Sequence, residues 1–308
     1  MTRRRKGSLV SGWLILDKPA GLTSTQAVTK VRRLFDAAKA GHAGTLDPLA
    51  TGVLPIALGE ATKTVPFAVE GLKTYRFTVR FGAETDSDDA EGAVVTESAA
   101  RPETEAIEAM LPRFTGEISQ VPPRFSALKV DGARAYDLAR DNEEFELAPR
   151  VVSIERLTLI ARPDPNHCVL EAECGKGTYV RALARDLGRA LGSCAHVAAL
   201  RRTRVGGFGE EDAVTLAELE ALKESAAEGE AFTRALKPVE SALSDIPALA
   251  LSLSDAARLR QGQPVLLRGR DAPIFSGTAY ATSRGMLVAV GEMEAGEFRP
   301  KRIFNFPR

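Results

Sequence analysis

Residues 41–52 read Gly-His-Ala-Gly-Thr-Leu-Asp-Pro-Leu-Ala-Thr-Gly, the most informative stretch of this 308-residue sequence. Three glycines, two threonines and a proline exclude a helix interior and predict an ordered turn between regular elements. Pro48 fixes its own φ and disfavours the α region for Asp47, so the turn holds Asp47 extended. A carboxylate on a stiff loop among small residues suits a group that reaches into a substrate. The alternative is that Asp47 and Pro48 simply start a turn.

The elements around this turn follow from local patterns. Thr23 and Gln26 have the spacing of a helix-capping box, and apolar residues follow at helical spacing. Short apolar runs bounded by Gly and Pro predict buried strands. The segments predicted on either side of the turn are a strand at 13–16, a helix at 24–37, a strand at 52–58 and a short helix at 60–69.

Residues 73–82, Lys-Thr-Tyr-Arg-Phe-Thr-Val-Arg-Phe-Gly, alternate strictly between two faces, one of them apolar. This period of two predicts a half-buried strand. Tyr75 is the first residue of the apolar face, at a strand end where an aromatic ring can border a cleft. The alternative is an ordinary core aromatic.

A helix predicted over residues 178–191 carries two stripes with four-residue spacing. One stripe is Leu183, Leu187 and Leu191, and the other is Arg181, Arg185 and Arg189. The Gly-Lys-Gly-Thr that precedes it at 175–178 lacks the spacing of a nucleotide-binding phosphate loop, so we expect no nucleotide cofactor.

The remaining segments predict two domains. Residues 209–247 are rich in Ala and Glu and predict connecting helices, whereas a small β-rich unit begins near residue 248. We therefore expect a large domain over 1–247, with a basic tail at 1–9, and a small domain over 248–308. The other predicted helices are 102–114, 133–141 and 254–261, and the other predicted strands are 151–161, 168–174, 194–205, 264–268, 286–291 and 297–305.

Composition describes an ordinary globular protein, with 44% hydrophobic and 27% charged residues. No apolar run approaches the roughly 20 residues of a membrane span, and the N-terminal apolar stretch lacks a signal-peptide cleavage site. Three cysteines without a C-x-x-C pair predict reduced thiols and a cytoplasmic protein. None of the three histidines has a partner ligand at zinc spacing, so we expect no metal site.

Charge is unevenly distributed although the formal net charge is zero. Residues 1–35 have a net charge of +7 and residues 175–205 of +6, whereas residues 83–118 have −8. If the two basic blocks meet in space, they form a phosphate-binding face from which the acidic block is displaced. The alternative is that each block is simply solvated surface.

Seven motifs follow one another between about residues 10 and 206. They are Leu-Asp-Lys-Pro-Ala-Gly-Leu-Thr-Ser (16–24), the stretch 41–52, Lys-Thr-Tyr (73–75), Thr-Asp-Ser-Asp-Asp-Ala-Glu-Gly (85–92), Ser-Ala-Leu-Lys-Val-Asp-Gly-Ala-Arg-Ala-Tyr (126–136), Gly-Thr-Tyr-Val-Arg-Ala-Leu-Ala-Arg-Asp-Leu-Gly (177–188) and Leu-Arg-Arg-Thr (200–203). In this order they resemble the bacterial tRNA pseudouridine-55 synthases, the tRNA pseudouridine synthase B family. The C-terminal unit is similar to a PUA-like RNA-binding domain in size and strand content.

The resemblance implies an α+β fold in which helices flank a largely antiparallel central sheet crossed by the active-site cleft. It implies a cofactor-free isomerase acting on the T-loop uridine of tRNA, and we expect a monomer that contacts the T-arm. By motif position, Asp47 corresponds to the catalytic aspartate, Tyr75 to the active-site tyrosine and Arg181 to the arginine paired with the aspartate. Positions that contact the extruded nucleotide correspond to His42, Tyr179 and Leu200, and Lys18 belongs to the motif that supports the active-site loop.

The chemistry is consistent with these residues. One carboxylate can either add to the sugar or base as a nucleophile or remove the C2′ proton, and the sequence leaves both routes open. An arginine keeps that carboxylate ionised, although Arg181 could instead bind a phosphate. Flipping the uridine out of its loop costs a few kcal/mol, and stacking on Tyr75 and Tyr179 offsets this cost.

The other assignments have plainer alternatives. His42 either fills the space of the flipped base or is an ordinary turn residue, and Leu200 either lies under the uracil or packs in the core. The cluster of Arg201, Arg202 and Arg204 is predicted to hold phosphates. Two rival functions stay open, a non-catalytic RNA-binding or RNA-folding protein and a pseudouridine synthase acting on rRNA.

Overall fold

The computed structural model describes residues 7–126, 128–130, 132–141, 143, 145–225, 234–267 and 275–306. Residues 1–6 of the predicted basic tail and Asp131 of the motif at 126–136 lie outside this part of the chain. Within it, no helix combines the length and the hydropathy needed to cross a membrane.

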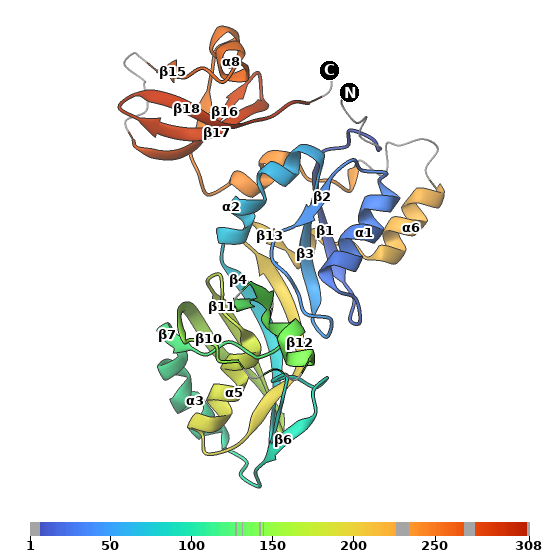
Figure 1. Cartoon of the computed structure of the whole chain (residues 1–308), viewed down its shortest axis with the longest axis vertical. Helices are drawn as coiled ribbons and strands as arrows, with labels where there is room; N and C mark the ends of the chain where they lie inside the picture. Colours follow the sequence, from blue (N-terminus) through green and yellow to red (C-terminus); the bar gives the residue numbers. More distant parts are fainter. Residues whose placement is uncertain are drawn as a thin grey trace.

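A large sheet forms the centre of the molecule (Figure 1). Every strand pair in it is antiparallel except β12 with β3, which confirms the prediction of a largely antiparallel sheet. Among the described residues the strand order is β1 (Gly12–Lys18), β3 (Thr51–Leu58), β12 (Ala195–Val205), β4 (Lys73–Phe81), β11 (His167–Cys174), β10 (Arg150–Asp164) and β7 (Gly116–Gln120), with β2 (Ala40–His42) on β3 and β13 (Phe208–Gly209) on β12.

The parallel pair between β12 and β3 places sequence-distant motifs side by side. Arg201 and Arg202 of β12 lie opposite Thr51 and Gly52 of β3. On its other edge β12 pairs with β4, where Arg202 faces Tyr75. Strand β12 therefore lies between β3, which follows the Asp47 loop, and β4, which carries Tyr75.

The helices pack on this sheet as their apolar stripes predict. Helix α5 contacts β12 and β4, and α1 lies beside α6 near the N-terminal strands. The Thr23–Gln26 capping box is present, but α1 ends at Leu34 rather than at residue 37 because Asp36 has a left-handed backbone, with φ of 45°. The helices are α1 (Ser24–Leu34), α2 (Val65–Glu70), α3 (Thr104–Met110), α4 (Ala135–Arg140), α5 (Val180–Ala190) and α6 (Leu216–Ser225), with 3-10 turns η1 (Gly59–Lys63), η2 (Leu111–Phe114), η3 (Glu210–Asp212) and η4 (Val239–Leu243).

Strand β4 shows the predicted alternation. Phe77, Val79 and Phe81 are buried in the main hydrophobic cluster, whereas Arg76 and Arg80 are exposed. Two short hairpins leave the sheet: β5 (Ala83–Thr85) with β6 (Val94–Glu97), and β8 (Lys129–Val130) with β9 (Ala133–Arg134). The first of them lies in the acidic segment 83–118.

A second sheet, drawn in red, lies at one end of the molecule (Figure 1). Strands β14 and β16 were not predicted, because one is three residues long and the other contains mostly small residues. The elements are β14 (Ala248–Ala250), α8 (Leu253–Arg260), β15 (Val265–Leu266), β16 (Gly277–Ser283), β17 (Met286–Glu294) and β18 (Glu297–Ile303), in the sheet order β14-β16-β17-β18-β15.

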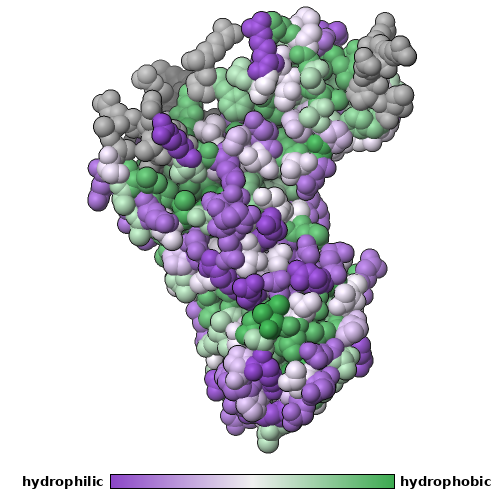
Figure 2. Space-filling model, turned by 180° about the vertical axis from the view of Figure 1, so that it is seen from behind, coloured by the Kyte–Doolittle hydropathy of each residue, from purple (hydrophilic) through white to green (hydrophobic). Residues whose placement is uncertain are grey.

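The two sheets share a hydrophobic cluster. Leu287, Val290 and Phe304 belong to the same buried group as Trp13 and Val53 of the large sheet. Figure 2 shows a notch between the C-terminal lobe and the main body, and hydrophilic side chains dominate the middle of that face. The shared cluster joins the lobes beside this notch.

Candidate active site

The loop between β2 and β3 carries Asp47 and is held from both sides. Ser24 Oγ accepts a hydrogen bond from the Leu46 amide (2.8 Å) and donates one to the Leu46 carbonyl (3.0 Å). On the other side the Gly21 amide donates to the Pro48 carbonyl (2.9 Å). The Asp47 side chain remains 37% exposed, so the loop presents a fixed carboxylate to solvent.

Lys18 lies beneath this loop and is fully buried. Its ammonium donates to the carbonyls of Pro19 (2.9 Å) and Leu22 (2.8 Å) and, at 3.4 Å, to that of Pro48. Burial lowers the pKa of Lys18 to about 8, and the nearby negative charge of Asp47 opposes this shift. The predicted supporting position of Lys18 agrees with this geometry.

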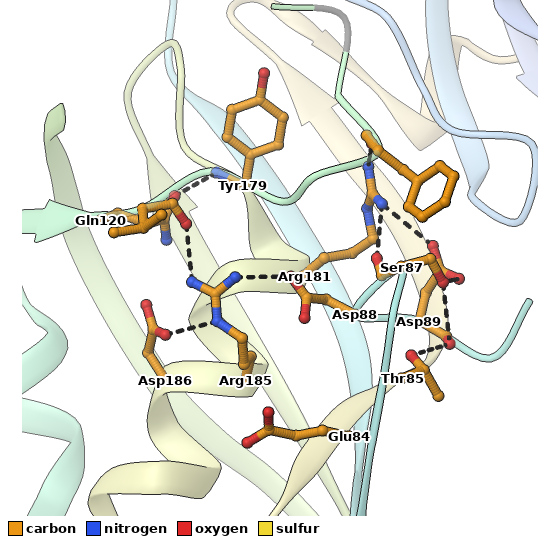
Figure 3. A network of polar contacts seen from close by, with 12 residues as sticks. Glu84, Thr85, Ser87, Asp88, Asp89, Gln120, Tyr179, Arg181, Arg185 and Asp186 are labelled. Atoms are coloured by element: carbon orange, nitrogen blue, oxygen red, sulfur yellow. Dashed lines mark hydrogen bonds and ion pairs between the residues drawn. The ribbon is translucent and has the colours of Figure 1, made fainter. Parts of the chain in front are cut away.

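Arg181, in the first turn of α5, has its guanidinium directed inward (Figure 3). Nε lies 2.9 Å from Asp47 Oδ2, and the two terminal nitrogens donate to the carbonyls of Ser87 and Phe125, each at 2.8 Å. Asp89 Oδ2 lies 3.5 Å from Nη1. Because Arg181 is only 4% exposed and fully engaged, its geometry agrees with pairing to Asp47 and leaves no free edge for a phosphate.

The other arginines of the α5 stripe also face acids within the protein. Arg185 lies 2.8 Å from Asp88 and donates to the Val121 carbonyl, and Arg189 lies 2.6 Å from Glu84. Burial raises the pKa of Asp88 to about 6, although Arg185 opposes the shift. The predicted displacement of the acidic block from the basic block is therefore wrong, because the fold packs one directly on the other (Figure 3).

A pocket of about 270 Å³ opens in front of Asp47. This volume lies just below the roughly 300–1,000 Å³ of typical small-ligand pockets. The predicted residues that line it are Asp47, Tyr75, Tyr179, Arg181, Leu200 and Arg202. The structure thus brings six of the eight predicted site residues to one cavity.

The two tyrosines give this pocket aromatic surface. Burial raises the pKa of both Tyr75 and Tyr179, which keeps their phenols neutral near pH 7. Leu200, on β12, is 6% exposed and supplies an apolar wall. An aromatic and an aliphatic wall suit a flat, uncharged ring.

Arg202 does not have the predicted phosphate-binding geometry. Its side chain is 1% exposed, and its guanidinium donates to the carbonyls of Val53 (2.8 Å) and Gly44 (3.0 Å). Arg202 therefore ties the Asp47 loop to β3. Gly52 permits the close backbone pairing of β3 with β12, since a Cβ there would lie 2.2 Å from the Arg202 carbonyl oxygen.

The neighbouring arginines are engaged in ion pairs at the surface. Arg201 lies 3.0 Å from Asp17 and also pairs with Glu210, and Arg204 lies 3.2 Å from Glu211. A phosphate would have to compete with these carboxylates. The predicted three-arginine phosphate cluster is not present as such.

His42 ends β2 and is not among the residues that line the pocket. Its Nδ1 is buried and makes no hydrogen bond. Burial, reinforced by the positive charge of Arg202, lowers the pKa of His42, so the ring is neutral near pH 7.

Sequence reasoning missed several residues that shape this site. Ser24 and Asp89 hold Asp47 and Arg181 from behind, and both lie inside motifs that were recognised without being assigned individually. Lys73 and Ser126 line the pocket. Lys73 is almost buried, donates to the carbonyls of Val69 and Gly71, and has its pKa lowered by burial.

In the part of the chain that the structure describes, no group of three or more His, Cys, Asp or Glu could hold a metal ion. Cys168, Cys174 and Cys194 are free and buried.

Comparison with known proteins defines the class. Residues 32–180 match the model of the TruB family pseudouridylate synthase (N terminal domain), and residues 181–244 match the tRNA pseudouridylate synthase B C-terminal domain. In a solved Cbf5-Nop10-Gar1 complex, one chain aligns with a TM-score of 0.72 and 25% identity, over 95% of this chain and 84% of that one. The class is therefore that of the pseudouridylate synthases.

Individual relatives narrow the assignment from this class to one family within it. The tRNA pseudouridine synthase B of Bradyrhizobium diazoefficiens is 63% identical over 98% of this chain and 88% of its own. That of Rhizobium meliloti is 58% identical over 98% of both chains. The chain belongs to the TruB family of pseudouridylate synthases.

Proposed function

We propose that this protein isomerises the T-loop uridine at position 55 of tRNA to pseudouridine, with Asp47 as the catalytic residue. The observation that carries the proposal is the partly exposed Asp47 carboxylate, 2.9 Å from the Arg181 guanidinium at the wall of a nucleotide-sized pocket. Relatives named tRNA pseudouridine synthase B, up to 63% identical, support tRNA as the substrate.

The reaction breaks the C1′–N1 bond, turns the uracil and joins C5 to C1′. The proton on C5 is finally lost to water, and N1 takes up a proton, so that the product is an isomer of the substrate. Asp47 either forms a covalent bond to the sugar or base, or removes the C2′ proton to give a glycal. In both routes the carboxylate must be ionised and correctly directed. The buried guanidinium of Arg181 supplies both conditions.

The walls of the pocket provide for the extruded base. A ring between Tyr75 and Leu200 regains part of the stacking that it loses on leaving the T-loop, about 1–3 kcal/mol per aromatic contact. Tyr179 is placed to contact the same nucleotide. His42 is partly exposed at the end of β2, and we propose that it braces the rearranged RNA loop.

Asp47→Asn tests this proposal because it keeps the shape of the side chain and removes its charge. We expect tritium release from tRNA labelled at uridine C5 to fall below detection, while tRNA binding stays within about threefold of the wild type. Asp36→Asn is the matched control: Asp36 is exposed, and asparagine tolerates its left-handed backbone equally well. Undiminished release by Asp47→Asn would remove the proposed mechanism.

The same assay separates the rival functions. A non-catalytic RNA-folding protein would release no tritium even as wild type. A synthase acting on rRNA would release it from rRNA transcripts and not from an isolated T-arm hairpin, which we propose as the minimal substrate.

We also propose that residues 1–247 form the catalytic domain and residues 248–308 a PUA-like RNA-binding domain. The five-stranded second sheet with its own buried cluster supports this division. A monomer is proposed in solution, which light scattering during size exclusion would test. Three buried free cysteines agree with a proposed cytoplasmic location.

A further inference from the structure

Positive charge dominates the lining of the pocket. Its charged residues, among those that the structure describes, are Asp47, Lys73, Lys176, Arg181 and Arg202. The charge of Arg181 is balanced by Asp47 and Asp89. That of Lys176 is balanced at the rim by Glu70. Two of the four cations are therefore left to be accounted for.

Lys73 and Arg202 are both buried cations, 5% and 1% exposed. In the part of the chain that the structure describes, no carboxylate forms an ion pair with either of them. A buried charge without a counter-ion is costly, and such groups gather at functional sites. Two of them at the wall of one pocket favour a ligand that carries negative charge during the reaction.

The Lys73 side chain projects from the same face of the sheet as the two walls proposed to hold the base. Lys73 precedes Tyr75 by two positions on β4, and alternate residues of a strand share a face. Leu200 of β12 lies opposite Phe77, the next residue of that series, and so belongs to the same face. A base held between Tyr75 and Leu200 therefore lies on the side from which Lys73 projects.

The ammonium of Lys73 has a hydrogen-bond donor to spare. It donates to the carbonyls of Val69 and Gly71, the latter at 2.6 Å, and Val69 also lines the pocket. An ammonium has three N–H donors, and no third acceptor is recorded for it among the described residues. Burial, reinforced by the positive charge of Arg202, lowers the pKa of Lys73. A negative charge nearby would favour its protonated form.

We propose that the Lys73 ammonium donates its third hydrogen bond to a carbonyl oxygen of the extruded uracil and stabilises the negative charge that this ring acquires when its bond to the sugar breaks. Lys73 would thus be a catalytic residue in addition to Asp47. This inference rests on the proposed function, because it concerns the same base in the same pocket.

Each route open to Asp47 places negative charge on the base. When C1′–N1 breaks, its electron pair stays with N1 and spreads to the carbonyl oxygens, whether Asp47 bonds to C1′ or removes the C2′ proton. If Asp47 adds to C6 of the base, the electrons of the C5–C6 double bond move toward the carbonyl oxygen on C4. Lys73 keeps its proton throughout, since water accepts the C5 proton and supplies the one on N1. Fixed donors aimed at developing charge are among the strongest catalytic effects.

Lys73→Met tests the proposal with two T-arm hairpins, one carrying uridine and one 5-fluorouridine at the target position. Fluorine withdraws electrons, so the fluorinated ring bears negative charge better and depends less on the ammonium. Single-turnover formation of the rearranged nucleoside is measured at saturating RNA. We expect Lys73→Met to slow the uridine hairpin about 100-fold and the fluorinated hairpin about 10-fold. Binding of both should stay within about threefold of the wild type.

Lys63→Met is the matched control. The Lys63 ammonium is also partly buried and donates to a backbone carbonyl, that of Ile303 (2.7 Å), but Lys63 does not line the pocket. Its loss should leave both rates unchanged. If Lys73→Met slows the two hairpins equally, Lys73 only holds the carbonyls at the end of α2, and the proposal is overturned. Unchanged rates would overturn it as well.

A second variant and the wild type keep the conclusions separate. Should Lys73→Met fail to fold, Lys73→Gln keeps a donor for the Val69 and Gly71 carbonyls and removes the charge, and the same difference between hairpins is expected. Wild-type protein that releases no tritium from the uridine hairpin contradicts the proposed function. An active wild type whose Lys73 variants show no difference between hairpins contradicts the role of Lys73 alone.

Discussion

Ser24→Ala tests whether the Asp47 loop must be held rigidly. Ser24 is buried, and its hydroxyl both accepts from the Leu46 amide and donates to the Leu46 carbonyl. The substitution removes both bonds next to Asp47, the proposed catalytic residue. No atom of Ser24 is among those that line the pocket, so any effect on turnover acts through Asp47.

The magnitude follows from the amide that loses its partner. Leu46 is 3% exposed, so water does not readily replace the lost acceptor. An unsatisfied buried amide costs about 1–3 kcal/mol, and we expect the free energy of unfolding to fall by about 2 kcal/mol. For a protein of this size, with an unfolding entropy of about 2.1 cal/mol/K per residue, the melting temperature falls by roughly 3 °C. A carboxylate displaced by part of an ångström loses on the order of 10- to 100-fold in kcat.

The assay combines thermal unfolding with single-turnover tritium release at saturating tRNA. Ser8→Ala is the control, because Ser8 Oγ donates to the carbonyls of Phe35 (3.0 Å) and Asp36 (3.1 Å) near the surface, far from the loop. That variant should stay within about 0.5 kcal/mol of the wild type. If Ser24→Ala matches Ser8→Ala in both melting temperature and kcat, the reasoning about the loop is refuted.

Three further predictions concern buried charge and backbone. Asp88→Asn should remove a pH dependence of stability. Because the pKa of Asp88 is raised to about 6, the folded wild type binds its proton more tightly than the unfolded chain does. The free energy of unfolding of the wild type, measured by urea titration, should therefore fall by roughly 3 kcal/mol relative to the variant between about pH 4 and 7. Parallel titrations of the two proteins would contradict this. Lys18→Met should lower kcat at pH 7. It should also abolish the fall in kcat/KM that we expect for the wild type above about pH 8, where the Lys18 ammonium loses its proton. If the pH–rate profile of the variant still falls above about pH 8, Lys18 is not the source of that fall. Gly52→Ala should cost more than the about 1–2 kcal/mol expected for Gly21→Ala, because both glycines have positive φ but only the Cβ at Gly52 meets the backbone of Arg202. Equal denaturant midpoints for these two variants would refute the steric argument.

Local structure was largely predictable. The capping box at Thr23, the alternation of β4 and the leucine stripe of α5 are short-range patterns set by periodicity and local hydrogen bonding. The motif order indicated the family, and through it the residues Asp47, Tyr75 and Arg181. Strands β14 and β16 were not predicted, because neither combines length with apolar side chains.

The groups that each arginine contacts could not be predicted from charge counts. The arginines of α5 looked like a phosphate-binding stripe, but each of the three pairs with an acid from the segment 84–89, and Arg181 also with Asp47. Arg202 was predicted to hold a phosphate, whereas its buried guanidinium donates to backbone carbonyls. A composition window records how many charges a segment has and carries no information about which of them the fold places face to face.

The amino-acid sequence by itself predicted most of the helices, the longer strands and the stiffness of the Asp47 turn, because each depends on neighbours within a few positions. Its motifs supplied the candidate site residues. The tertiary structure alone decided that β12 lies between β3 and β4. That strand order places Asp47, Tyr75 and Leu200 around one cavity, together with the buried Arg202. Contacts between residues more than a hundred positions apart depend on how the whole sheet is assembled, and no local pattern encodes that order.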